Sequence, residues 1–131
     1  MQGTSLDQFY GRQWFLAEVI TAEGPTAFSR EELERLNMGD CFSLEFDAER
    51  LSGKGAPNRF TAPYTASGNT LSISAPVSTL MAPLVEPAGL KERDYFSYLT
   101  GDAQWELSED WLWLYTRDDS GGLVILGFTG R

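Results

Sequence analysis

Short apolar segments separated by turn signals are the feature that most constrains the fold of this chain. In Phe42–Phe46 the apolar residues alternate with polar ones, and Thr70–Ser74 shows the same period of two. That period indicates a strand with one buried face. Further predicted strands, rich in aromatic and β-branched residues, cover 14–20, 59–64, 103–107, 111–116 and 123–128. Many short strands with little helix predict a mainly β (α+β) fold, a small antiparallel β-barrel-like closed sheet.

Two of the predicted strands are apolar on both faces. Trp111–Tyr115 and Leu123–Leu126 consist of large apolar side chains, so they need cover on both sides of the sheet. A helix is predicted near 91–100, and it is the candidate for the outer cover. The apolar stripe of this helix consists of Leu90, Phe96 and Leu99.

A second, short helix is predicted near 29–36. Ser29 is followed three residues later by Glu32, which matches the capping box that begins many helices. Only Leu33 and Leu36 are available to anchor this helix to a core.

The length of 131 residues fits one domain with one core. Residues 1–11 are polar and are expected to be an N-terminal lead-in segment, with 12–131 as the single domain. The proline-containing segment 75–89 is predicted to be an irregular crossing loop. No stretch approaches the roughly 20 apolar residues of a membrane span, and the N-terminus lacks the regions of a signal peptide. The chain is therefore expected either to be cytoplasmic or to be a mature segment whose leader has been removed.

The charge balance of the chain is acidic. It holds 10 Lys and Arg against 19 Asp and Glu, for a formal net charge of -9. Such a surface repels phosphate backbones, which disfavours a nucleic-acid partner. It also disfavours simple electrostatic docking on anionic lipid.

The chain contains no histidine and one cysteine, Cys41. Ser-His-Asp and Cys-His catalysis are therefore excluded, as are an intramolecular disulfide and a thiolate metal cluster. Cys41 is interpreted as a small residue at the start of a strand. We expect no catalytic residue, no metal and no cofactor. An enzyme that uses carboxylates alone is the remaining catalytic hypothesis, with Glu92/Asp94 and Glu109/Asp110 as its pairs, although solvated charges explain them more simply.

Two loops carry polar residues of the kinds that bind ligands. Ser52–Gly55 suggests a phosphate loop, but Lys54 is followed by glycine rather than Ser or Thr, so we predict a tight turn or bulge. Asp118–Gly121 offers oxygen ligands without the spacing of a calcium loop. It is predicted to be a solvated hairpin loop, with a weak cation site as the alternative.

Trp111 and Trp113 are the most informative side chains because they share one face of a strand, while Leu112 and Leu114 share the other. Packing in the core is the simplest interpretation of the tryptophans. The alternative is an aromatic-lined pocket or an exposed patch that contacts a partner.

The order of motifs along the chain matches a known domain family. That pattern opens with a Trp-x-Leu strand and a Phe-containing strand, and continues with a G-x-x-G-C-N-x-[YF]-x-G-x-Y signature, a T-x-M-A-C element, an acidic aromatic helix and a closing hairpin. The matching segments are Trp14–Leu16, Leu44–Phe46, Gly53–Tyr64, Thr79–Pro83, Glu92–Leu99, Leu112–Leu114 and Gly122–Phe128. Over roughly 12–128 the chain resembles the META domain of HslJ-like bacterial envelope proteins.

The chain departs from this family pattern at both cysteines, which are Pro57 and Pro83 here, and at two glycines, which are Ala56 and Ala62. The joint loss implies that the two cysteines lie near each other in relatives and form a disulfide. Pro57 restricts φ and stiffens the same turn in a different way.

The resemblance implies a small β-barrel-like domain with no settled enzyme activity or cofactor, found on secreted proteins or lipoproteins and linked to heat-shock and stress tolerance. We expect a non-enzymatic module of the cell envelope, in the periplasm or anchored to the outer membrane through a lipid on the full-length precursor. Its partner is expected to be an envelope protein or a small apolar ligand. The alternative is a lipocalin-like barrel that binds a small apolar molecule in its cavity. The predicted contact surface consists of Trp111, Trp113, Lys54, Asn58, Phe60 and Tyr64.

Overall fold

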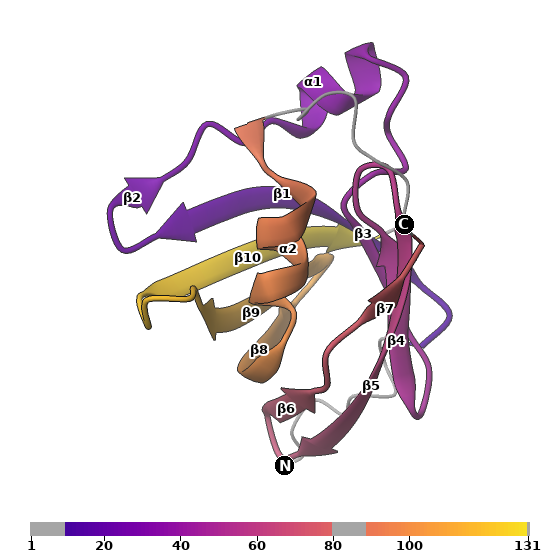
Figure 1. The fold of residues 1–131 in the computed structure, drawn as a ribbon, viewed down its shortest axis with the longest axis vertical. Helices are drawn as coiled ribbons and strands as arrows, with labels where there is room; N and C mark the ends of the chain where they lie inside the picture. The colour runs from indigo at the N-terminus through magenta and orange to yellow at the C-terminus, as the bar shows by residue number, and fades with distance from the viewer. Residues whose placement is uncertain (1–9, 80–88, 131) are drawn as a thin grey trace.

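The computed structural model describes residues 10–79 and 89–130. Within these residues, eight antiparallel strands form a closed barrel in the order β10-β9-β8-β6-β5-β4-β3-β1, and β1 pairs with β10 to complete the ring. Two very short strands, β2 and β7, pair with β1 and β5. The strands are β1 (Gln13–Thr21), β2 (Gly24–Pro25), β3 (Ser43–Phe46), β4 (Arg50–Lys54), β5 (Arg59–Ser67), β6 (Thr70–Ile73), β7 (Val77–Ser78), β8 (Gly101–Ser108), β9 (Trp111–Arg117) and β10 (Leu123–Gly130). The predicted mainly β closed sheet is confirmed (Figure 1).

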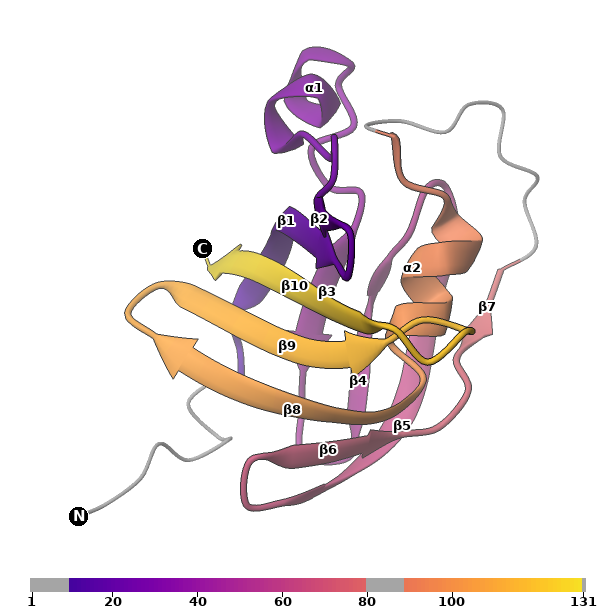
Figure 2. The same cartoon turned by 90° about the vertical axis from the view of Figure 1, so that its left-hand side faces the viewer.

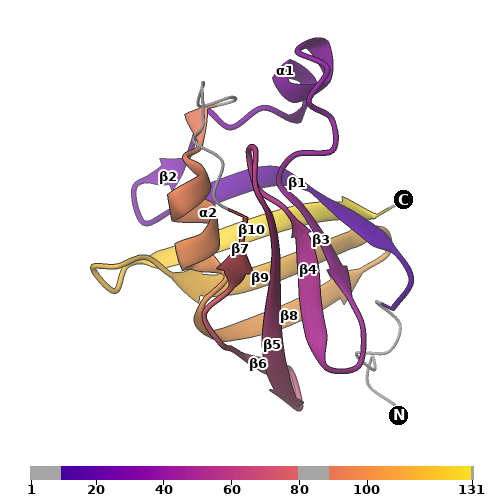
Figure 3. The ribbon, with the colours of Figure 1, turned by 45° about the vertical axis from the view of Figure 1, so that its right-hand side comes forward.

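The barrel has two walls that matter for function. Strands β10, β9 and β8 lie side by side on one wall, which faces the viewer in Figure 2. Strands β3, β4 and β5 form the opposite wall, which comes forward in Figure 3. The two walls are joined through β6 on one side and β1 on the other.

Alternating side chains from the strands fill the inside of the barrel. The fully buried large residues include Trp14, Phe42, Leu44, Leu51, Leu71, Tyr95, Leu99, Leu112 and Phe128. For the strand residues this packing follows from the period of two, because every second residue of a strand points to the same side. Phe42 lies just before β3, and Tyr95 and Leu99 come from helix α2 (Glu92–Tyr98) and its C-cap.

Both predicted helices are present. The longer one, α2 (Glu92–Tyr98), lies across one end of the barrel between the two walls (Figures 1 and 2). Its Tyr95 is completely buried, and the ring stands edge-on to Phe42 and Phe60, which point into the barrel. The helix therefore closes an end of the barrel. The sequence suggested that it would cover the outer face of β9, and that prediction is wrong. Tyr95 belongs to its buried stripe in addition to Leu90 and Leu99.

The short helix α1 (Arg30–Arg35) begins as predicted, since the Ser29 hydroxyl accepts a hydrogen bond from the Glu32 N–H at 3.2 Å. Its anchoring differs from the prediction. Leu33 is fully buried, but Leu36 is 52% exposed. The second anchor is Arg30, whose guanidinium donates to main-chain carbonyls on β1 and on the segment before β3, at residues Leu16, Gly39, Cys41 and Phe42.

Several strand boundaries in the structure differ from the predicted ones. Phe42 has φ of 53° and precedes β3, so it is not part of that strand. The glycine-rich stretch is a strand up to Lys54, and the turn follows at 55–58, with a cis peptide between Ala56 and Pro57. Strand β5 continues through Pro63 to Ser67. Pro63 is tolerated because its hydrogen-bonding edge faces β6, whose register with β5 begins only at Tyr64, so no ladder bond needs a Pro63 N–H.

Some predictions fall outside the described residues. These are most of the lead-in segment 1–11, the middle of the crossing loop at 80–88, and the proximity of Pro57 to Pro83. No helix of the described residues is long and apolar enough to cross a membrane.

Candidate functional site

The outer side of β9 carries a row of three half-buried aromatic residues, Trp111, Trp113 and Tyr115, which we call the aromatic face. The rings of Trp111 and Trp113 are stacked, with centroids 5.1 Å apart and planes 8° apart. Leu112 and Leu114, between them in sequence, are 0% and 1% exposed inside the barrel. The simplest interpretation of the tryptophans, packing in the core, is therefore wrong.

The backbone of β10 holds this stack in place. Gly127 lies directly opposite Trp113 in the β9–β10 ladder. A Cβ atom at Gly127 would lie 2.6 Å from Cζ3 of the Trp113 ring. The glycine therefore allows the indole to lie against the neighbouring strand, and this contact fixes the ring. Sequence reasoning missed Gly127, because a strand glycine gives no local sign of what lies across from it.

Acidic side chains border the aromatic face. Glu106 lies opposite Trp113 on β8, and its carboxylate accepts a hydrogen bond from the Tyr115 hydroxyl at 3.1 Å. Burial raises the pKa of Tyr115, with the Glu106 hydrogen bond acting in the same direction, so the phenol stays protonated and donates at neutral pH. Glu109 and Asp110, in the turn before Trp111, are exposed.

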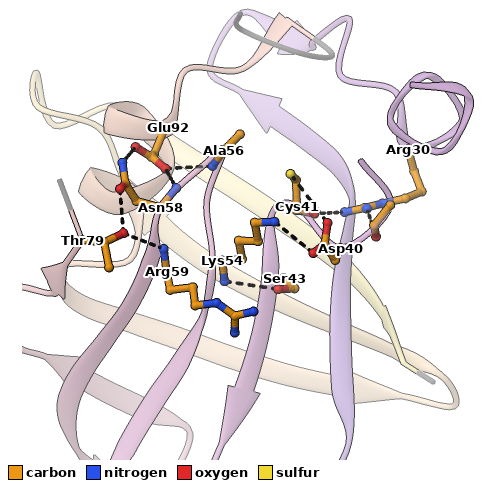
Figure 4. Close-up of polar contacts among 11 residues, drawn as sticks. Arg30, Asp40, Cys41, Ser43, Lys54, Ala56, Asn58, Arg59, Thr79 and Glu92 are labelled. Atoms are coloured by element: carbon orange, nitrogen blue, oxygen red, sulfur yellow. Dashed lines mark hydrogen bonds and ion pairs between the residues drawn. The ribbon is translucent and has the colours of Figure 1, made fainter. Parts of the chain in front are cut away.

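On the opposite wall, a network of hydrogen bonds joins the β4–β5 turn to the start of α2 (Figure 4). The Glu92 Oε1 atom accepts hydrogen bonds from the main-chain N–H groups of Ala56 at 2.8 Å and of Asn58 at 2.6 Å. The Glu92 Oε2 atom accepts from Asn58 Nδ2 at 2.7 Å. On its other side, Asn58 Oδ1 accepts from the Thr79 hydroxyl at 2.6 Å. Asn58 is only 5% exposed, so it ties the turn to the helix rather than facing solvent.

The other predicted contact residues on this wall are also engaged within the protein. Phe60 is buried against Tyr95 and Phe96. Tyr64 is buried and donates its hydroxyl to the main-chain oxygen of Asp47 at 2.5 Å. Burial, followed by the neighbouring Tyr10 hydroxyl, raises the pKa of Tyr64.

Lys54 is the exception on this wall, since it points outward. Its ammonium group donates to the Asp40 carboxylate at 2.9 Å. This hydrogen bond with Lys54 holds the pKa of Asp40 below its usual value, against the opposing effect of burial. The six predicted contact residues thus occupy opposite walls of the barrel, and the structure does not bring Trp111 and Trp113 together with the residues of the β4–β5 hairpin.

The remaining reactive groups have structural roles. Cys41 is 2% exposed, and burial raises the pKa of its thiol. The Asp118 carboxylate accepts hydrogen bonds from the N–H and hydroxyl of Ser120 and from the N–H of Gly122, which closes its hairpin loop. In the proposed catalytic pair Glu92/Asp94, the Glu92 carboxylate is held by hydrogen bonds from the β4–β5 turn. Within 10–79 and 89–130, no three acidic or cysteine side chains are arranged to hold a metal ion.

Comparison with known proteins places these features in a family. The model of the META domain family matches residues 7–125 of the chain. An NMR structure of a protein from Burkholderia xenovorans has the same fold, with a TM-score of 0.67 and 19% sequence identity, over 100% of this chain and 94% of that one. Comparison with curated proteins gives no significant match. Because the family match spans most of its length, the chain belongs to the META domain family.

Proposed function

We propose that this META domain is a non-enzymatic contact module of the bacterial cell envelope, and that it binds a partner protein through the aromatic face. The observation that carries the proposal is the stacked pair of Trp111 and Trp113 on the outer side of β9. Tryptophan is among the residues that contribute most binding energy at protein interfaces. A folded domain gains little by leaving two indoles partly in solvent unless another molecule covers them.

The geometry of the aromatic face suits binding. The stack and the contact between Trp113 and Gly127 fix the rings before a partner arrives. Ring positions that are already fixed reduce the conformational entropy lost on binding. The partner surface is expected to be apolar at its centre, to receive the indoles.

The border of the aromatic face specifies the partner's charge. Glu106 lies beside the rings and the exposed Glu109 precedes Trp111, while the charge of Asp110 is offset by Arg12 at 3.4 Å, in a chain of formal net charge -9. Complementary charges at the rim of an interface steer association and reject wrong partners. We therefore expect Lys or Arg residues around the apolar centre of the partner surface.

The envelope location rests on the resemblance to HslJ-like proteins. In this proposal the full-length precursor carries a lipid anchor, residues 1–11 act as the tether, and the domain contributes to stress tolerance. The alternative, a lipocalin-like barrel for a small apolar molecule, requires an open apolar cavity. The inside of this barrel is filled by large side chains such as Phe42, Tyr95 and Phe128, which favours the contact module.

The test is capture of the protein from its own cells after expression of the full-length gene, followed by native mass spectrometry. A bound protein recovered with the wild type should be lost from a Trp111→Ala/Trp113→Ala double variant. The matched control is Leu123→Ala, which removes an apolar side chain that is 43% exposed on β10, and it should retain the partner. Equal recovery with the double variant would remove the aromatic face from the proposal. A retained small apolar molecule would support the lipocalin-like alternative, and an acyl group on the N-terminus would support the anchor.

A further inference from the structure

A hollow of about 460 Å³ lies on the outer side of the β3–β4–β5 wall, opposite the aromatic face. Its volume is within the range of pockets that hold small molecules. The side chains that give it its chemistry are Asp40, Ser43, Glu45, Ser52, Lys54 and Arg59. This hollow is separate from the proposed protein-contact surface, and it has no part in that function.

The first unusual feature of the hollow is a pair of facing cations. Lys54 and Arg59 are directly opposite each other in the antiparallel β4–β5 ladder. Like charges in this position destabilise a sheet. The chain has only 10 basic residues against 19 acidic ones, so two basic residues facing each other are unexpected from its composition. Asp40, which is paired with Lys54 and also attracted to Arg59, offsets part of this repulsion, and an anion bound at Arg59 would offset more of it.

The two cations differ in their availability. Lys54 is held by Asp40, 2.9 Å away. Arg59 is exposed, and its guanidinium forms no ion pair with any residue of the described chain. Figure 4 shows its side chain directed away from Thr79, which is bonded instead to the main-chain N–H of Arg59. A guanidinium presents two parallel N–H donors, which match the two oxygens of a carboxylate.

The second unusual feature is that carboxylates line the same hollow. Asp40 and Glu45 accompany Lys54 and Arg59, so the formal charges of the lining cancel. A doubly charged phosphate would meet repulsion from the two carboxylates. A molecule with one negative and one positive group would find a partner for each, with Arg59 facing its carboxylate and Glu45 facing its ammonium group. The Ser52 hydroxyl, opposite Glu45 in the β3–β4 ladder, offers a further hydrogen bond.

The backbone under the hollow is built for a close approach of two strands. A Cβ atom at Gly53 would collide with the main-chain oxygen of Ser43. Without that atom, the Lys54 N–H donates to the Ser43 hydroxyl at 3.2 Å. The glycine thus holds β4 against β3 and sets where the Lys54 side chain leaves the sheet.

From these observations we propose that the hollow binds a small zwitterion, an amino acid or a short peptide, whose carboxylate pairs with Arg59 and whose ammonium group pairs with Glu45. The facing cations supply the affinity for the carboxylate, and the acidic lining selects against plain anions.

The experiment is titration of the isotope-labelled chain with four probes while backbone amide signals are followed by NMR. The probes are trialanine, glycine, acetate and inorganic phosphate. Trialanine should give saturable shifts at Ser43, Ser52, Lys54 and Arg59, and it should bind more tightly than glycine, with acetate weaker than both. Shifts on β9 instead would place binding elsewhere and overturn the proposal. Tighter binding of phosphate than of trialanine would also overturn it, in favour of a simple anion site.

Variants make the assignment specific. Arg59→Gln should weaken trialanine binding by about tenfold or more, the effect of losing a charge-assisted pair. The matched control is Arg50→Gln, which removes the same charge from the other end of β4, and it should leave binding nearly unchanged. Glu45→Gln should weaken trialanine but not acetate. An equal loss in Arg59→Gln and Arg50→Gln would show that only the overall charge matters and would overturn the site.

Discussion

Glu92 binds both amide groups of Asn58, the main-chain N–H at 2.6 Å and the side-chain Nδ2 at 2.7 Å, although the two residues are 34 positions apart. The asparagine that matches the family signature therefore holds the β4–β5 turn against α2. The tie places the helix over the end of the barrel, where Tyr95 of that helix enters the core. The role of this signature residue is structural.

The first prediction concerns this tie. Glu92→Gln should lower the free energy of unfolding by about 1.5–3 kcal/mol, because hydrogen bonds to a charged acceptor are lost and a side-chain amide group would meet the Asn58 amide. The measurement is urea unfolding at neutral pH. The control is Glu31→Gln, which removes a carboxylate from the first turn of α1 and so reproduces any effect of the helix dipole. If the two variants lose equal stability, the tie to Asn58 contributes nothing of its own.

The second prediction concerns the stacked tryptophans. Gly127→Ala should displace the Trp113 ring, since the new Cβ would be 2.6 Å from Cζ3 of that ring. The near-ultraviolet circular dichroism of the stacked indoles should diminish, and stability should fall by about 1–3 kcal/mol as in other overpacked sites. The control is Gly39→Ala, whose Cβ would make an ordinary 3.5 Å contact with the Glu34 side chain. An unchanged spectrum in Gly127→Ala would contradict the role of Gly127.

The third prediction concerns Arg30, which donates to four main-chain carbonyls, at distances of 2.9 to 3.2 Å. Arg30→Lys should cost about 1–3 kcal/mol of stability, because an ammonium group lacks the planar fork and leaves carbonyls without donors. Hydrogen exchange around Cys41 should accelerate. The control is Arg35→Lys in the last turn of the same helix, which should change stability little. Equal effects of the two substitutions would mean that only the positive charge of α1 is important.

The fourth prediction concerns alkaline pH. Burial raises the pKa of Tyr95 above its ordinary value, and its hydroxyl donates to the main-chain oxygen of Ser43 at 2.8 Å. A folded pKa above the unfolded value of about 10 means that the stabilisation is complete below that pH and is lost as pH rises from there towards the folded pKa. The wild type should therefore lose stability steeply above about pH 10.

Tyr95→Phe tests this link. At neutral pH the variant should be less stable by about 0.5–1.5 kcal/mol, the loss of one buried hydrogen bond. Its stability should fall less steeply above about pH 10, so the gap to the wild type should narrow. Parallel curves for the two proteins in denaturant unfolding across this range would show that Tyr95 does not titrate on unfolding.

Local patterns predicted most of the strands and both helices. The alternation in Thr70–Ser74 and the capping signal at Ser29 are confirmed by β6 and α1. Predictions failed where one residue depends on a distant one. Leu36 was expected to anchor α1, but Arg30 does so by reaching carbonyls on other segments. The strand predicted over 59–64 was too short, because β5 continues through Pro63, where no ladder bond needs an N–H, to Ser67.

The candidate site was predicted in part. Trp111 and Trp113 were singled out because two tryptophans one residue apart share a face. Grouping them with Asn58, Phe60 and Tyr64 failed, since those residues lie on the opposite wall and mostly point inward. No local signal reveals how strands are ordered around a barrel, or which wall each one joins.

The sequence by itself determined the period of the strands, the absence of histidine chemistry and the family. Only the tertiary structure decided which face of β9 is outside. Periodicity distinguishes the two faces of a strand but identifies the buried one only when the other is polar. In β9 both faces are apolar, so the choice came from closure of the ring, in which β10 and β8 pair with it and set Leu112 and Leu114 inward. The same closure left Trp111 and Trp113 on the outer surface.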